Sequence, residues 1–172
     1  MYFIRVIEDI TERKHAEEAL QQSEKLFRSI FENAQIGISI FGIDTQAHLT
    51  NRALQEMLGY PEKELRGLDQ WDGIVHPDER ISSAKRYAEM IEGKRDADDY
   101  ETRLVRSDGR IVVVNGRFQL LRDAAGKPQY LVALTEDITE RKRSEEALQA
   151  RDRKSTRLNS SHRSLSRMPS SA

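Results

Sequence analysis

A segment of thirteen residues occurs twice in this chain, and the two copies fix how the sequence between them is organised. They cover residues 9–21 and 137–149 and read DITERKHAEEALQ and DITERKRSEEALQ. Aligning residues 2–24 with residues 130–152 gives 13 identities in 23 positions, and self-similarity of this kind is typical of tandem arrays. We therefore expect one intact repeat between two connectors, cut from a longer array. Its function would be that of a module in a relay, not that of a free-standing enzyme.

The end of the chain lacks the patterning of a folded element. Residues 152–162 read DRKSTRLNSSH, which matches in order the translated codons of a sequencing-library adapter, and the remaining RSLSRMPSSA is rich in serine with no apolar period. We expect residues 152–172 to be an adapter-derived, disordered tail. A natural basic tail of this composition would lack a fold as well.

Without that tail the chain is mildly acidic, with 23 lysines and arginines against 28 aspartates and glutamates in residues 1–151. This balance argues against a nucleic-acid partner, because nonspecific affinity for nucleic acid depends on clustered basic residues. No apolar run approaches the length of a membrane span, and Ile111 to Val114 is only four residues long, so we expect no membrane insertion. The N-terminus shows no signal-peptide pattern and the chain has no cysteine, which excludes disulfides and thiolate metal sites and favours a cytoplasmic location.

The first connector predicts a helix. Asp9 and Glu12 form an acidic variant of the capping box, in which the two side chains satisfy the first free amides of a helix. Apolar or small residues then recur at steps of three and four, and these are Leu20, Ser23, Phe27, Ile30 and Phe31. Such a narrow stripe suits a partner helix, and packing on the chain's own domain is the alternative.

The sequence between the connectors alternates between strand and helix patterns and indicates an α+β domain. Expected strands cover residues 36–44, 47–50, 99–106, 111–121 and 129–136, and expected helices or helical turns cover 51–58, 62–65, 69–75 and 77–91. Asp108-Gly109 is a strong signal for a hairpin. In the strand after that turn, Val112, Val114, Gly116, Phe118 and Leu120 face one way and the polar residues between them face the other.

This order of elements resembles a PAS domain with its C-terminal PAC motif. The resemblance covers residues 23–140 and rests on RLVRSDGRIVVVNGRFQLLRDAAGKPQYLVALTEDITERK at residues 103–142. WDGIVHPDER at residues 71–80 also matches the sequence that precedes the long helix in this family, and Asp137-Ile138-Thr139 matches the family's junction motif.

The resemblance implies a PAS fold, which is a five-stranded antiparallel sheet with helices on one face, flanked by N- and C-terminal linker helices. The expected segments are 1–8 (last strand of a truncated preceding repeat), 9–25 (linker helix), 26–138 (PAS/PAC domain), 139–151 (start of the next linker helix) and 152–172 (tail). It also implies homodimerisation through the flanking helices. The signal would leave the domain at the junction formed by Asp137, Ile138 and Thr139, where a strand becomes a helix.

Ligand chemistry is less well specified by the residues. A cysteinyl-flavin adduct is excluded because there is no cysteine, and haem is not expected because Ile81 to Ile91 contains no histidine. An empty pocket without cofactor is therefore our expectation, with noncovalent flavin as an open alternative. If a ligand binds, the residues expected around it are Ile38, Ile40, Leu54, Met57, Tyr87, Met90, Val114 and Phe118.

No catalytic or metal-binding pattern occurs in the sequence. His15 and His48 have no second ligand at metal spacing, and there is no glycine-rich phosphate loop or nucleophile motif. The segment itself is thus not expected to be an enzyme. Junctions of this type accompany sensor histidine kinases, which are the expected effector, and diguanylate cyclases come next. The alternative function is a structural spacer or protein-interaction module without a ligand.

Overall fold

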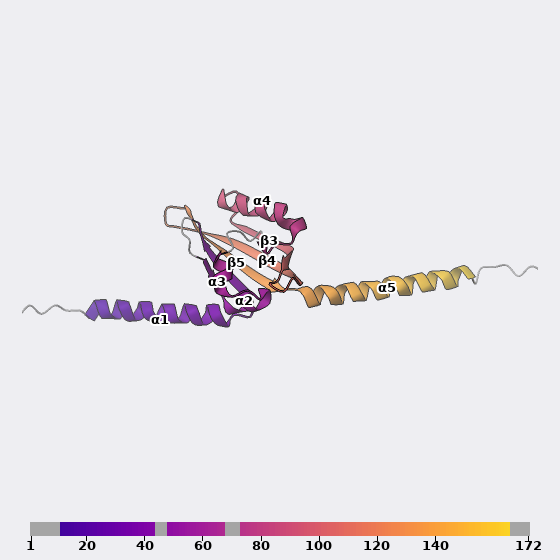
Figure 1. The fold of residues 1–172 in the computed structure, drawn as a ribbon, viewed down its shortest axis with the longest axis horizontal. Coiled ribbons are helices and arrows are strands. Elements are labelled where there is room, and N and C mark those ends of the chain that lie inside the picture. Colours follow the sequence, from indigo (N-terminus) through magenta and orange to yellow (C-terminus); the bar gives the residue numbers. More distant parts are fainter. Residues whose placement is uncertain (1–10, 44–47, 68–72, 166–172) are drawn as a thin grey trace, which may run out of the picture.

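The computed structural model describes residues 11–43, 48–67 and 73–165, which form a small sheet domain between two long helices (Figure 1). The helices are α1 (Thr11–Asn33), α2 (Arg52–Leu58), α3 (Glu62–Gly67), the 3-10 turn η2 (Pro77–Glu79), α4 (Arg80–Ile91) and α5 (Thr139–Leu165). The strands are β1 (Gly37–Gly42), β2 (His48–Thr50), β3 (Ala97–Val105), β4 (Ile111–Arg122) and β5 (Pro128–Asp137). In Figure 1, α1 and α5 leave the domain on opposite sides.

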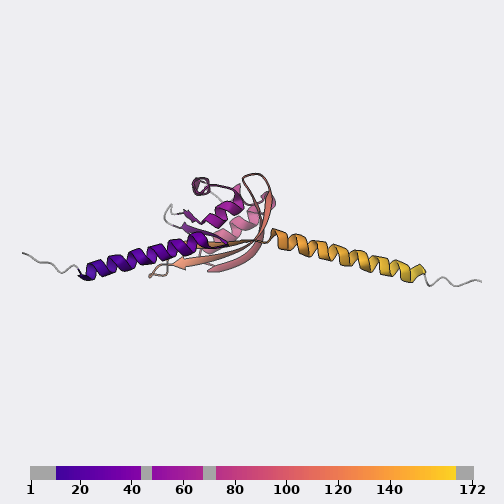
Figure 2. The ribbon, with the colours of Figure 1, turned by 90° about the horizontal axis from the view of Figure 1, so that it is seen from below.

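The five strands form one antiparallel sheet, as expected, and their order is β2-β1-β5-β4-β3. The first strand pairs with the last because the chain crosses over through α2, α3 and α4 before it returns to the sheet at β3. These helices lie over one face of the sheet (Figure 2). The other face is left free by them, which gives the sheet a covered inner face and an outer face.

The inner face carries the core, which consists of two clusters. One cluster lies under α2 and α3 and comprises Leu54, Leu58, Leu65, Ile74, Val75, Leu104, Val112 and Val114. The other lies at the far end of α4 and comprises Met90, Leu120 and Leu131, with Phe41, Ile43 and Phe118 against it. The predicted alternation of β4 is confirmed, because Val112, Val114 and Leu120 are buried there.

The turn between β3 and β4 follows its predicted sequence signal. Gly109 has a φ of 81°, a conformation that glycine adopts without a steric penalty. The amide of Arg106 donates to the carbonyl of Arg110 at 2.8 Å, and the Asp108 carboxylate accepts from the Arg110 amide at 3.0 Å. The Asp-Gly pair therefore sets the register of β3 against β4.

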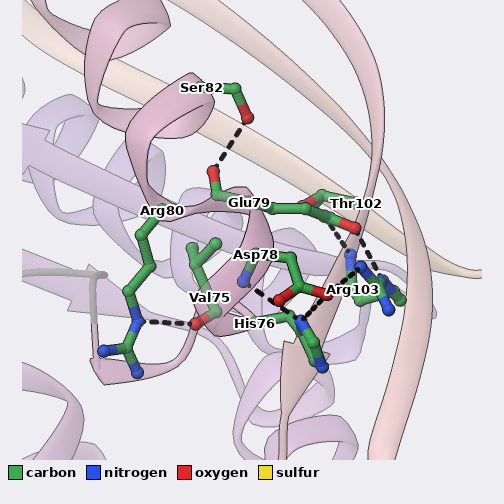
Figure 3. A network of polar contacts seen from close by, with 8 residues as sticks. All are labelled: Val75, His76, Asp78, Glu79, Arg80, Ser82, Thr102 and Arg103. Carbon is green, nitrogen blue, oxygen red and sulfur yellow. Dashed lines mark hydrogen bonds and ion pairs between the residues drawn. The ribbon is translucent and has the colours of Figure 1, made fainter.

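The segment before α4 covers the free edge of β3. The amide of Val105 donates to the carbonyl of Ile74 at 2.7 Å, and the amide of His76 donates to the carbonyl of Arg103 at 2.9 Å. Unpaired strand edges invite aggregation, so this segment protects the sheet. The predicted long helix begins at Arg80 instead of Pro77, because Pro77–Glu79 forms a separate 3-10 turn (Figure 3).

The flanking helices extend beyond the expected linker segments. α1 ends at Asn33, close to the last residue of the predicted helical stripe, Phe31, and passes residue 25 because no glycine or proline interrupts it. α5 continues past residue 151 to Leu165, so residues 152–165 differ from the tail without fold that we expected. The physical reason is the same, because the first proline after Thr139 is Pro169. The resemblance of residues 152–162 to an adapter stays a prediction about their origin.

Some expected elements lie outside the described residues. They are the strand over residues 1–8, the start of the hairpin strand at Ala47 and most of the helical turn over residues 69–75. Within the described ranges, no helix is both long and apolar enough to cross a membrane.

Candidate functional site

The junction between β5 and α5 is the first candidate site. Asp137 is the last residue of β5, and its carboxylate accepts a hydrogen bond from the amide of Thr139 at 2.8 Å. Ile138 lies between them and is buried, and its amide donates to the carbonyl of Val113 at 2.9 Å. The carboxylate of Asp137 therefore caps the helix by accepting from its first free amide.

Thr139 contacts the sheet and not only its own helix. Its hydroxyl oxygen accepts a hydrogen bond from the amide of Val113 on β4 at 2.9 Å. The amide of Lys142 donates to the carbonyl of Ile138 at 2.9 Å, which is the start of the α5 ladder. The first turn of α5 is therefore fixed to the neighbouring strand, so a change in the twist or register of β4 would move the base of α5.

A groove of about 530 Å³ lies beside this junction. It is lined by the end of α1, by α2 and by the end of β5, through Glu32, Ala34, Gln35, Arg52, Ala53, Glu56, Met57 and Asp137. Arg52 is already paired with Glu56 at 2.6 Å. The groove shows that the incoming helix ends next to the point where the outgoing helix begins.

Asn51 joins these parts from the inside and was not singled out by the sequence. Its side-chain oxygen accepts from the amides of Ile38 at 2.8 Å and Leu54 at 3.1 Å. Its side-chain nitrogen donates to the carbonyls of Phe31 at 3.0 Å and Ile36 at 2.9 Å. The residue is fully buried, so one amide group ties α1, β1 and α2 together. Its place before a short helix, as an N-cap, was the available signal.

The predicted ligand-pocket residues on α2, α4 and β4 are divided between the two clusters of the core. Leu54, Met57 and Val114 belong to the cluster under α2 and α3, whereas Met90 and Phe118 belong to the cluster under α4. Tyr87 lies on α4 and is about half exposed, and burial raises the pKa of its hydroxyl. Whether any of these residues contacts a ligand stays a prediction.

The placement of Ile38 and Ile40 needs correction. In β1 the buried positions are Gly37 and Ser39, so the two isoleucines project to the outer face of the sheet. Their partners on β5, Leu134 and Val132, lie on that outer face too. An alternating strand that ends in a glycine-rich turn does not reveal which of its two faces is covered, and here the smaller residues face inward.

An aromatic pair lies on the inner face at β3 and β4, and the sequence analysis missed it. The ring of Tyr100 stacks on Phe118 with centroids 5.2 Å apart, and the guanidinium of Arg86 lies 5.4 Å from the Tyr100 centroid. Gly116 faces this ring so closely that a Cβ there would lie 2.7 Å from Tyr100 Cζ. Burial raises the pKa of Tyr100, so its hydroxyl stays protonated at neutral pH. A glycine inside a strand was the signal for this close approach.

A polar cluster fixes the start of α4 to β3 (Figure 3). The Glu79 carboxylate accepts from the Thr102 hydroxyl, from the Arg103 amide at 2.8 Å and from the Arg103 guanidinium at 2.6 Å. Arg103 also lies 3.3 Å from Asp78. Burial alone raises the pKa of Glu79, but these hydrogen bonds outweigh it and hold the pKa below its usual range. We call Glu79, Thr102 and Arg103 the α4 clasp.

Across the described residues, no group of three or more histidine, aspartate or glutamate side chains is arranged to hold a metal ion. The junction, the inner-face aromatic pair and the α4 clasp each join two elements, namely α5 to β4, β3 to β4, and the start of α4 to β3.

Comparison with known proteins gives the family. Residues 48–135 match the family described as PAS fold, and the chain belongs to this family. It is 33% identical over 138 residues to the probable diguanylate cyclase DgcE of Escherichia coli (strain K12), covering 80% of this chain and 12% of that protein. It is 27% identical over 130 residues to the sensor histidine kinase TmoS of Ectopseudomonas mendocina, covering 76% of this chain and 13% of that protein.

Solved structures show the same fold. A sensory box histidine kinase/response regulator from Burkholderia thailandensis E264 is 27% identical, with a TM-score of 0.57, and the match covers 76% of this chain and 98% of that chain. The five-stranded sheet with its flanking helices is thus the PAS fold that the sequence predicts. The chain spans only 12% and 13% of the two curated relatives named above, so it corresponds to one sensory domain within such proteins.

Proposed function

We propose that this chain is a sensory and dimerisation module that receives a ligand or a conformational signal on the inner face of its sheet. The module passes that signal through α5 to a downstream effector. The observation that carries the proposal is the junction, where the first turn of α5 is bonded to Val113 of β4 through both Ile138 and Thr139. A shift of the sheet therefore has a direct path to the base of the helix.

Homodimerisation through the flanking helices is supported by the surface of α1. Leu20, Phe27 and Ile30 are 61%, 51% and 63% exposed, although they recur on one face of the helix. Phe31, next in the predicted stripe, is 7% exposed and packs on the domain. The end of the stripe therefore packs on the chain's own domain, and the rest of it is accessible to a second copy.

For the effector we propose a sensor histidine kinase, supported by the similarity to TmoS and to the Burkholderia thailandensis structure. A diguanylate cyclase is the second candidate, supported by the similarity to DgcE. Sequencing the source gene beyond Arg151 distinguishes them, since an acceptor-histidine domain supports the first and a cyclase domain supports the second. Neither activity belongs to this segment, so incorporation of labelled phosphate from ATP by residues 1–151 would contradict the proposal.

Sensing and a ligand-free spacer are separated by a direct search for a ligand. The protein is purified from its own host and examined by absorption spectroscopy and by native mass spectrometry. A bound small molecule at one copy per chain supports sensing at the inner face. Repeated purification without any added mass supports the spacer, in which the domain only sets the orientation of its flanking helices.

A further inference from the structure

The outgoing helix touches its domain at two points on one side. Among the α5 side chains that the structure describes, only Thr139 and Lys142 are partly covered, and all others are exposed. Residues three apart lie on the same face of a helix. The base of α5 therefore rests on the sheet along a single line, with Thr139 bonded to Val113 of β4.

The second point is an ion pair to the edge strand. The ammonium nitrogen of Lys142 lies 2.6 Å from a carboxylate oxygen of Glu101 on β3. The next two residues of β3, Thr102 and Arg103, are the ones that bind Glu79 in the α4 clasp. Three consecutive residues of one strand thus connect the start of α4 to the first turn of α5.

Comparison of the two copies of the connector indicates that Lys142 and the neighbouring Arg141 make different kinds of contact. Arg13 pairs with Glu17 at 3.0 Å, and Arg141 pairs with Glu145 at 3.9 Å, so in both copies the arginine binds within its own helix. Lys142 instead reaches out of the helix to the sheet.

We propose that Lys142 is a positioning residue that, by binding Glu101, fixes the direction in which α5 leaves the domain. The inference rests on the proposed function, because it names the contact through which the edge of the sheet reaches the outgoing helix. An ion pair of two partly exposed side chains adds little to stability. Its effect is geometric, since a helix held only at its very start, by Ile138 and Thr139, is free to pivot, whereas a further contact at Lys142 restrains its direction.

The direction of α5 is measurable with spin labels, because the chain has no native cysteine. Labels at Ala125→Cys, in the exposed β4–β5 turn, and Gln149→Cys, on α5, report the distance between domain and helix by pulsed dipolar spectroscopy. The labelled chain is diluted with unlabelled chain so that only distances within one copy contribute. We expect one narrow distance distribution in the otherwise unchanged protein.

Loss of the ion pair, by Lys142→Gln or by Glu101→Gln, should shift and broaden the distance distribution between the two labels. Arg141→Gln, the matched control on the neighbouring residue, should leave the distribution unchanged. The exchanged pair Lys142→Glu with Glu101→Lys should restore the narrow distribution. Thermal unfolding of every variant checks that the domain is folded. A Lys142→Gln distribution equal to that of the parent overturns the proposal, and so does equal broadening in Arg141→Gln.

A separate variant tests the proposed function independently of the lysine. Thr139→Val removes the hydroxyl that accepts from Val113 with almost no change in shape. If Thr139→Val moves α5 and Lys142→Gln does not, the junction transmits the signal and only the role of Lys142 is lost. If neither variant moves α5, the junction is not the output of the domain and the proposed function fails with it.

Discussion

Asn51 shows how one buried amide group holds several elements together. Its side chain uses both lone pairs of its oxygen and both hydrogens of its nitrogen on backbone groups of α1, β1 and α2. Ser39, equally buried, has a hydroxyl without a hydrogen-bond partner among the described residues. Removing the Asn51 side chain therefore leaves buried backbone groups without hydrogen-bond partners, whereas removing the Ser39 hydroxyl does not.

Asn51→Ala should lower the free energy of unfolding by about 2–4 kcal/mol, because the cap is lost and buried backbone groups are left without partners. Ser39→Ala, the control at equal burial, should be neutral or slightly stabilising. Urea denaturation followed by circular dichroism measures both. Equal losses for the two variants would show that burial alone, and not the hydrogen bonds, explains the effect.

Glu79 gives the α4 clasp a defined pH dependence. Its pKa is lowered in the folded state, so the clasp stabilises the protein above the pKa of the unfolded chain, and this contribution is lost as the pH falls through the folded value. Glu79→Gln should cost about 1 kcal/mol at neutral pH, and its difference from the parent should shrink below about pH 4.

Thermal unfolding between neutral and acid pH tests the clasp. Glu56→Gln is the control, because Glu56 forms an exposed ion pair with Arg52 within the same helix, α2. Glu56→Gln should change the midpoint temperature of thermal unfolding little at any pH. A Glu79→Gln difference that stays constant down to acid pH would contradict the clasp as the source of the stabilisation.

At the scale of elements, β3 and β4 are joined by more than their hydrogen-bond ladder. Tyr100 on β3 crosses over Gly116 on β4 and stacks on Phe118, so the two strands share one aromatic layer on the inner face. α4 touches this layer through Arg86, which also lies 3.5 Å from Asp98. The Tyr100 ring, for which Gly116 leaves room, is thus one of the contacts of α4 with the sheet.

Gly116→Ala should lower the free energy of unfolding by about 1–3 kcal/mol, because the added methyl group would overlap the Tyr100 ring. In a protein that already carries Tyr100→Leu, the same Gly116→Ala change should cost less, because the ring that the methyl group would overlap is no longer there. A double-mutant cycle by chemical denaturation measures the coupling. Additive losses would mean that Gly116 is needed for a reason other than the ring.

At the scale of the whole molecule, the two flanking helices project from a small domain and carry much exposed surface. The apolar stripe of α1, namely Leu20, Phe27 and Ile30, is the part of that surface suited to a second copy. If the proposed dimer forms there, its affinity depends on the stripe and not on apolar exposure in general.

Phe27→Glu should therefore weaken dimerisation at least tenfold, since burying one unpaired carboxylate in an apolar seam costs more than 1.4 kcal/mol, which is about a factor of ten in affinity. Ile81→Glu is the control, because Ile81 on α4 is 87% exposed and lies outside the stripe. Sedimentation velocity over a range of concentrations measures both. Equal weakening by the two variants would place the interface elsewhere.

Local pattern accounts for much of the fold. The alternation in β4, the Asp108-Gly109 turn and the capping residue Asp137 each act over a few neighbouring positions, so the strands, the hairpin and the start of α5 followed from the sequence. The duplicated connector likewise placed the domain between two helices. The ends of α1 and α5 were less well determined, because no glycine or proline marks them in the sequence.

Contacts across the chain were decided by the tertiary structure. The sequence of β1 alternates, but only the position of the helices settles that Ser39 faces inward and Ile38 outward. The contacts of Glu79 with Thr102, and of Lys142 with Glu101, join residues more than twenty positions apart. Local periodicity carries no information about such pairs, because they depend on how the sheet folds back on itself.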